Sequence, residues 1–151
     1  LWHYTHTSGS VTYRDLGQCG LRRNVMSYSQ PSPYCFTFLH DFGAATEALI
    51  FRGPKLKQGT VEEVEVIAYE TFNAVTTEAA VNIGSTAAGA EYVAMGLGTL
   101  ADGDEQRMTD TAADLVLAAL PADTDIHLTL KAPTGGSPAG KAYVQIMIHW
   151  Y

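Results

Sequence analysis

The chain has 151 residues, enough for one domain that buries about two-thirds of its unfolded surface on folding. Hydrophobic residues make up 46% of it and charged residues 17%, which is typical of a folded protein and excludes a disordered one. No apolar run approaches the ~20 residues that a membrane-spanning helix needs, so we expect no membrane partner.

The net charge of −7 is unevenly distributed along the chain. Residues 1–60 carry a net charge of +3, whereas residues 61–151 carry −10. A nucleic-acid-binding protein concentrates its basic side chains on one face, and an acidic surface repels phosphate. We therefore expect no nucleic-acid partner and favour a protein partner.

Residues 1–45 differ from the rest of the chain. They contain eight of the fifteen aromatic residues but little periodicity, and turn-forming clusters such as "TSGS" (7–10) and "SQPSP" (29–33) interrupt them. Only "YCFTFLHDF" (34–42) has the composition of a short strand. We predict an extended N-terminal arm over residues 1–45, with one or two short strands.

From residue 46 onward, short segments alternate between apolar and polar residues, which is typical of strands with one buried face. In "VEEVEVIAYE", for example, Val64, Val66 and Ala68 share one face, and Glu63 and Glu65 share the other. The predicted strands are 47–53, 61–70, 79–84, 91–97, 125–132 and 141–151.

The segment "TAADLVLAALPAD" (111–123) is ambiguous. Its Ala and Leu content suits a helix, but Leu115 and Leu117 alternate, and Pro121 ends either element. Because the neighbouring segments are strands, we favour a short strand here.

The last strand, "KAYVQIMIHWY", runs to the end of the sequence. Its face from Ala142 to Trp150 is apolar and is expected to complete the core. Its other face is too apolar for a plainly solvated surface, so we interpret it as a candidate subunit contact. That face carries Tyr143, Met147, His149 and Tyr151.

Short strands separated by turns, with no long amphipathic helix between them, predict an all-β fold. We expect an antiparallel β-sandwich, jelly-roll-like, over residues 46–151, preceded by the extended N-terminal arm over residues 1–45.

No pattern in the sequence indicates catalysis. The nucleophile elbow G-x-S-x-G and a phosphate-binding glycine loop are both absent. Glu63 and Glu65 are adjacent on one strand face and do not straddle a sugar as a glycosidase pair must. We therefore expect no catalytic residues and no enzyme activity.

Metal and cofactor sites are not expected either. Asp102 and Asp104 match only the first spacing of a calcium loop, and the possible zinc ligands lack the close pairing that zinc sites show. Those possible ligands are His3, His6, Cys19, Cys35 and His40.

Cys19 and Cys35 are the only cysteines. A disulfide between them would close a loop of about 16 residues and contribute ~3 kcal/mol in the chain-entropy model. Two cysteines do not make a disulfide scaffold, so we favour two reduced, partly buried thiols.

Two stretches carry a resemblance to a known group of proteins. They are "TTEAAVNIGSTAAGAEYVAMGLGTLADG" (76–103) and "LPADTDIHLTLKAPTGGSPAGKAYVQIMIHWY" (120–151). A strand ending "V-x-I-G", an "LPADT" turn before an "I-x-L-T-L" strand, and an alternating closing strand resemble the small β-sandwich proteins of tailed-bacteriophage virions. Within that group the sequence is most similar to capsid decoration (cement) proteins. The resemblance covers residues 46–151 and does not extend to the arm.

The resemblance implies a structural, non-enzymatic protein on the capsid exterior of the virion. It implies the major capsid protein as partner and a homotrimer as the assembled state. One alternative is a head-fibre or tail component of a phage. Another is a carbohydrate-binding β-sandwich module, for which Tyr143 and Tyr151 would supply two aromatic side chains on one face.

Aromatic residues and arginine dominate the energetics of protein interfaces, so they supply our candidate contacts. The arm would either dock on a partner or fold back and add its aromatics to the sandwich core, and the sequence leaves both open. The candidates for capsid or subunit contacts are Tyr13, Arg14, Arg22, Arg23, Tyr28, Tyr34, Phe36, Phe38, Tyr143, His149 and Tyr151.

Overall fold

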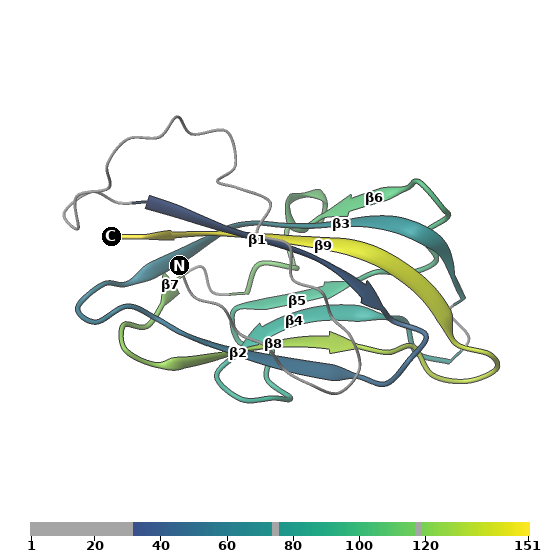
Figure 1. The fold of residues 1–151 in the computed structure, drawn as a ribbon, viewed down its shortest axis with the longest axis horizontal. Helices are drawn as coiled ribbons and strands as arrows, with labels where there is room; N and C mark the ends of the chain where they lie inside the picture. The colour runs from purple at the N-terminus through teal and green to yellow at the C-terminus, as the bar shows by residue number, and fades with distance from the viewer. Residues whose placement is uncertain (1–31, 74–75, 117–118) are drawn as a thin grey trace.

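The computed structural model describes residues 32–73, 76–116 and 119–151, which form two antiparallel sheets that face each other (Figure 1). This confirms the predicted all-β sandwich. Among the described residues, no helix has the length and apolar content that a membrane span requires.

The five-stranded sheet has the order β1 (Ser32–Asp41), β9 (Ala139–Trp150), β3 (Gly59–Asn73), β6 (Glu105–Arg107), and β7 (Ala119–Leu120) also pairs with β3. The four-stranded sheet has the order β2 (Glu47–Arg52), β8 (Asp125–Lys131), β4 (Ala80–Gly84), β5 (Val93–Gly96). A short 3₁₀ helix, η1 (Met108–Asp110), follows β6.

The order of strands is that of a jelly roll. The chain crosses from one sheet to the other between β1 and β2, between β2 and β3, and between β3 and β4. It then makes a hairpin of β4 and β5, crosses back to β6, and returns through β8 to β9. This connectivity is that of two Greek keys in a double sheet, so the prediction of a jelly-roll-like sandwich is confirmed.

The core forms where the apolar faces of the two sheets meet. In β9 the even-numbered residues from Ala142 to Trp150 are all buried, as the alternating pattern predicted. In β8, Ile126 and Leu130 are fully buried on the facing sheet. Period-2 alternation places one parity of each strand in this core, and the opposite parity lies outside the sandwich.

Strand β1 is part of the sandwich, although it lies in the region predicted as arm. It pairs with β9 along its whole length, from Ser32 opposite Trp150 to Asp41 opposite Lys141. Its even parity contributes the buried Phe38 to the core, and Phe42, which directly follows the strand, is also buried, which explains why this segment joins the sheet. The described sandwich therefore begins before residue 46, and removing residues 1–45 would remove an edge strand.

In the described part of the ambiguous segment 111–123, residues 111–116 and 119–123, little is strand. Only Ala119 and Leu120 are assigned to β7, and residues 111–116 form turns with one isolated bridge between Leu115 and Val93. Leu120 is buried and anchors the segment, whereas Leu115 is exposed, so the apparent alternation does not mark a continuous buried face.

Trp150 fixes the end of the sandwich where β9 finishes. Its ring is buried and lies so close to Gly59 that a Cβ atom on Gly59 would sit 2.6 Å from ring carbon Cε3. Gly59 is the direct partner of Trp150 in the β3–β9 ladder, so only glycine leaves room for the ring there. The ring thereby holds the start of β3 against the end of β9.

Replacing Trp150 tests this anchor. Trp150→Ala should lower the free energy of unfolding by about 3–5 kcal/mol, because it removes a buried aromatic ring and leaves a cavity. Chemical denaturation would measure the loss. Tyr151→Ala is the matched control: Tyr151 is 56% exposed, and its removal should change the free energy by no more than about 0.5 kcal/mol. Equal effects of the two variants would contradict the anchoring role.

Candidate interaction surfaces

An apolar patch lies on the outer face of the five-stranded sheet. Leu39 in β1 and Ile67 in β3 are both direct cross-strand partners of Tyr143 in β9, so the three side chains form one row. Tyr69 adds a fourth side chain, with its ring 6.2 Å from that of Tyr143 and nearly perpendicular to it. All four are exposed, from 39% for Ile67 to 61% for Tyr69. We call Leu39, Ile67, Tyr69 and Tyr143 the apolar patch.

A β-bulge in β3 shapes this patch. The register of β3 against β9 shifts between Ala68 and Glu70, so Tyr69 is the extra residue. Strict alternation would have pointed Glu70 into the core, whereas the bulge turns it outward, where its Oε2 lies 2.8 Å from Lys141 Nζ. The bulge thus supplies both the exposed tyrosine and its acidic neighbour.

Ion pairs form the rim of the apolar patch at one end. Besides its bond to Glu70, Lys141 Nζ lies 4.0 Å from Asp41 Oδ2. The hydrogen bond and the charge of Glu70, with the charge of Asp41, raise the pKa of Lys141, which keeps its ammonium group charged. These side chains are partly exposed, so their ion pairs contribute little to the stability of the fold. Their main effect is to favour partner surfaces of complementary charge.

A second set of ion pairs lies on the other side of the patch. Arg107 in β6 lies 2.7 Å from Glu65 and 3.7 Å from Glu105. Glu105 is also the cross-strand partner of Ile67. Together the two sets contain four carboxylates and two cations, so the rim of the apolar patch has a formal charge of −2.

His149 and Tyr151 lie on the same outer face but form a separate group. Their rings are 6.4 Å apart, and His149 Nδ1 lies 3.0 Å from Glu62 Oε1. Six residues of β9 separate His149 from Tyr143, a distance of about 20 Å along the strand. The structure therefore divides the three predicted contacts of the closing strand between two places.

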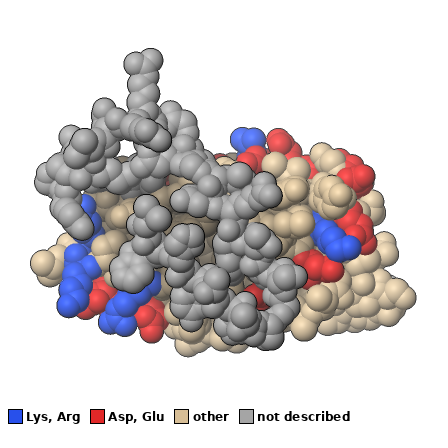
Figure 2. Space-filling view, in the orientation of Figure 1, with Lys and Arg blue, Asp and Glu red and all other residues tan. Residues whose placement is uncertain are grey.

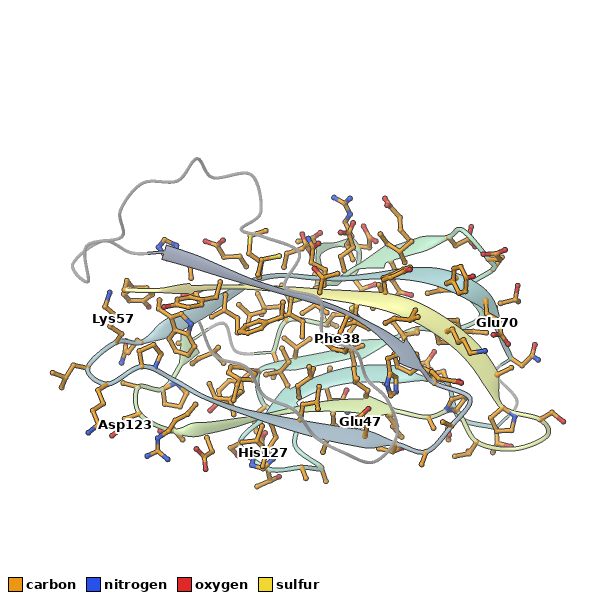
Figure 3. All side chains as sticks on the ribbon, in the orientation of Figure 1. Phe38, Glu47, Lys57, Glu70, Asp123 and His127 are labelled. Atoms are coloured by element: carbon orange, nitrogen blue, oxygen red, sulfur yellow. The ribbon has the colours of Figure 1, made fainter. Side chains whose placement is uncertain are left out.

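The predicted aromatic contacts in β1 lie on its core-facing parity. Tyr34 is 47% and Phe36 41% exposed, and the Phe36 ring lies 5.9 Å from that of Phe51 in β2. Phe38 points between the two sheets and is only 8% exposed, which leaves little of its ring for a partner (Figure 3).

Several residues of the sequence-based predictions fall outside the described residues. They are the candidate contacts Tyr13, Arg14, Arg22, Arg23 and Tyr28, the possible zinc ligands His3 and His6, and the cysteine Cys19. Cys35 is described and is partly buried in β1.

Sequence reasoning did not identify Leu39, Ile67 or Tyr69 as surface candidates. A signal was present in "EVIAYE", because Ile67 and Tyr69 continue the outward parity of Glu65. Two apolar residues at outward positions of an otherwise alternating strand indicate a surface that contacts something other than water.

A second feature without a sequence prediction is the β2–β3 loop, residues 53–58. Leu56 at its tip is 97% exposed and has a positive φ of 61°. Lys55 and Lys57 flank it. Figure 2 shows several Lys and Arg side chains gathered at this end of the sandwich, and Figure 3 shows Lys57 there, at the opposite end from Glu70.

The outer face of the four-stranded sheet has a different character. It contains a shallow open depression whose lining side chains are short or polar, and none of them is aromatic. The lining residues are Thr76, Thr77, Glu78, Ala80, Asn82, Ala94, Gly96 and Lys131.

Within the described part of the chain, no three His, Cys, Asp or Glu side chains are placed to hold a metal ion.

His40 is a buried titratable group beside these surfaces. It lies in β1, with its ring 4.6 Å from that of Phe42, and its Nδ1 is 3.3 Å from Glu47 Oε2 in β2. Burial lowers the pKa of His40, and the negative charges of Glu47 and Asp41 oppose that shift only in part. The folded protein therefore favours the neutral ring more than the unfolded chain does.

The protein should become less stable as the pH falls because of His40. A histidine with a lowered pKa contributes stability above its unfolded value of 6.5, and that stability is lost as the pH falls through the folded value. The melting temperature of the wild type should decrease more between pH 7 and pH 5 than that of His40→Gln, which has no ring to protonate. Thermal melts at several pH values would measure both slopes, and parallel curves would contradict this role.

Comparisons with known proteins give few matches. No protein-family model matches the sequence, and no curated protein matches it. The fold is similar to a solved chain of the cyanophage Pam1 capsid asymmetric unit, with a TM-score of 0.45 and 12% identity over 87% of this chain and 94% of that one. It is also similar to a chain of the capsid of Ralstonia phage GP4, with a TM-score of 0.47 and 15% identity over 86% and 91% of the two chains. Both similarities are weak, and neither assigns a role to this chain.

Proposed function

We propose that this protein is a structural, non-enzymatic component of a phage virion that binds the outside of the capsid and stabilises it. The observation that carries the proposal is the apolar patch. Four exposed side chains, contributed by three adjacent strands, form one contiguous surface with a charged rim. Contiguous exposed apolar surface of this kind is typical of a site that contacts another protein.

The sequence resemblance directs the proposal to a virion. It covers residues 46–151, which contain the strands of the described sandwich other than β1, and it points to capsid decoration proteins, with the major capsid protein as partner. The patch lies on the rigid strands β1, β3 and β9, which suits a permanent contact because little ordering is needed on binding.

The assembled state in this proposal is a homotrimer. Three linked copies raise the effective concentration of each capsid contact once the first has formed. Modest individual contacts then give long residence on the particle. A head-fibre or tail component would use the same kind of surface, but it would occupy another place on the virion.

Particles of the phage that encodes this chain provide the test. Particles assembled without the protein should bind the purified full-length chain on their surface and should then resist heat or low salt better. Cryo-electron microscopy of the reloaded particles would show the site of binding. Absence of the chain from purified virions would contradict the proposal, and density only at a fibre or tail would replace the capsid role with the alternative.

Tyr143→Ala should weaken particle binding by about tenfold or more, because it removes the central ring of the apolar patch. A binding titration on particles lacking the protein would measure the change. Ile50→Ala is the matched control, since Ile50 is an exposed apolar residue of β2 in the other sheet. Equal losses in the two variants would show that the patch has no special part in binding.

A carbohydrate-binding module is the second candidate, and the tyrosine pair favours it. Tyr69 and Tyr143 are exposed neighbours, and aromatic faces stack on sugars. Tyr143 and Tyr151, the pair suggested by the sequence, are eight residues apart on one strand, about 26 Å, too far to hold one sugar ring. Binding on a glycan array that is lost in Tyr143→Ala would favour this function over the capsid role.

A further inference from the structure

We propose that the β2–β3 loop of one copy of this chain docks on the apolar patch of a second copy. The contact is head to tail: Leu56 enters the surface formed by Leu39, Ile67, Tyr69 and Tyr143, and Lys55 and Lys57 meet the acidic rim. The contact rests on the proposed function in one respect, because the ring that it closes is the homotrimer proposed above. In that ring a neighbouring copy covers each apolar patch, so the patch serves the assembly of the trimer, and Tyr143→Ala weakens particle binding because the multivalency of the trimer is lost.

The conformation of the loop is suited to presenting Leu56. A positive φ is unfavourable for a bulky side chain, and glycine would adopt it without strain. A leucine that is both strained and 97% exposed gains nothing from its own fold. Its position is explained if the side chain is buried by a partner.

The base of the loop is held in place on both sides. Tyr151 N–H donates to the carbonyl of Gln58 at 2.9 Å, and Asp123 N–H donates to the carbonyl of Pro54 at 3.2 Å. The Trp150 ring lies against Gly53 and Gly59 at the two ends of the loop. Because its ends are fixed, the loop loses little conformational entropy when it docks.

The loop carries two positive charges on an acidic domain. Arg52 at the end of β2 pairs with both Asp123 and Asp125, each at 3.1 Å, so this group at the base of the loop has a formal charge of −1. Lys55 and Lys57 form no ion pair with any other described residue. The loop therefore presents a formal charge of +2 around one apolar side chain, which complements the −2 of the rim around the apolar patch.

The same charges disfavour symmetric contacts. Two apolar patches placed face to face would bring two negative rims together, and two loops placed tip to tip would bring four lysines together. Like charges in contact reduce affinity, so an isologous dimer through either feature is disfavoured. Of the three pairings of loop and patch, the one that brings opposite charges together is the loop of one copy against the patch of the other.

A single chain cannot make this contact with itself. Tyr151, which directly follows β9 and whose backbone N–H bonds to the loop at Gln58, is eight residues from Tyr143 in the patch. That separation is about 26 Å along a rigid strand. The contact is therefore heterologous, and it forms a closed ring when the rotation between neighbouring copies closes.

The test measures self-association of the full-length protein by sedimentation. Wild-type protein should assemble into a closed ring at micromolar concentration and dissociate as salt is raised, because salt screens the lysine–carboxylate pairs. Leu56→Asp and Tyr69→Asp should each weaken assembly by about tenfold or more. Ile50→Asp introduces the same charge at another exposed apolar position and should leave assembly unchanged. Circular dichroism would confirm that each variant is folded.

Mixing the two variants distinguishes the head-to-tail contact from every symmetric one. Leu56→Asp retains an intact patch and Tyr69→Asp retains an intact loop. At a concentration where each variant alone is monomeric, the mixture should therefore form a one-to-one heterodimer. A mixture that remains monomeric overturns the proposal. So does a monomeric wild type, or a wild type that instead binds vesicles of anionic lipid through Leu56.

This experiment contains no phage particles, so its outcome is separate from that of the proposed function. A ring that forms in solution but does not bind particles would preserve the head-to-tail contact and remove the capsid role. Particle binding by a chain that remains monomeric would preserve the capsid role and remove the head-to-tail contact.

Discussion

Strand β9 is the constraint on which the rest of the structure depends. It lies between β1 and β3 in the five-stranded sheet, and its two parities have opposite tasks. One parity fills the core as far as Trp150, and the other places Lys141 and Tyr143 on the outer face. A slip of one residue in this strand would exchange the two faces, so the burial of the core also fixes the position of the surface patch.

This coupling explains which parts of the molecule could be predicted from sequence. Alternation is a local property, and it predicted the strands around Val64, Ile83, Leu128 and Ile146 with nearly correct bounds. The jelly-roll arrangement was also predictable as a class, because short strands with no intervening helices have few ways to bury one face each.

The patch was less accessible to prediction, because it depends on register between strands that are far apart in sequence. Leu39, Ile67 and Tyr143 become a row only when β1 and β3 both pair with β9, and no local pattern contains that pairing. The bulge at Tyr69 adds a second difficulty, since the extra residue turns Glu70 outward at a position where strict alternation predicts a core residue. The prediction of a strand within residues 111–123 was less accurate for a related reason: its described residues 111–116 make a single isolated bridge and have no continuous partner strand.

Exposed apolar residues are common on folded proteins, and most of them need no explanation. Ile50 is of this ordinary kind, since its cross-strand partner is the polar residue His127. The patch around Tyr143 differs because its members touch one another across strands, and Leu56 differs because its backbone conformation is unfavourable for its side chain. Each feature is also surrounded by charge of a single excess sign, and the two signs are opposite. Two such surfaces at separate places on one rigid sandwich have the form of a complementary pair, and a repeated head-to-tail contact is the arrangement that satisfies both at once.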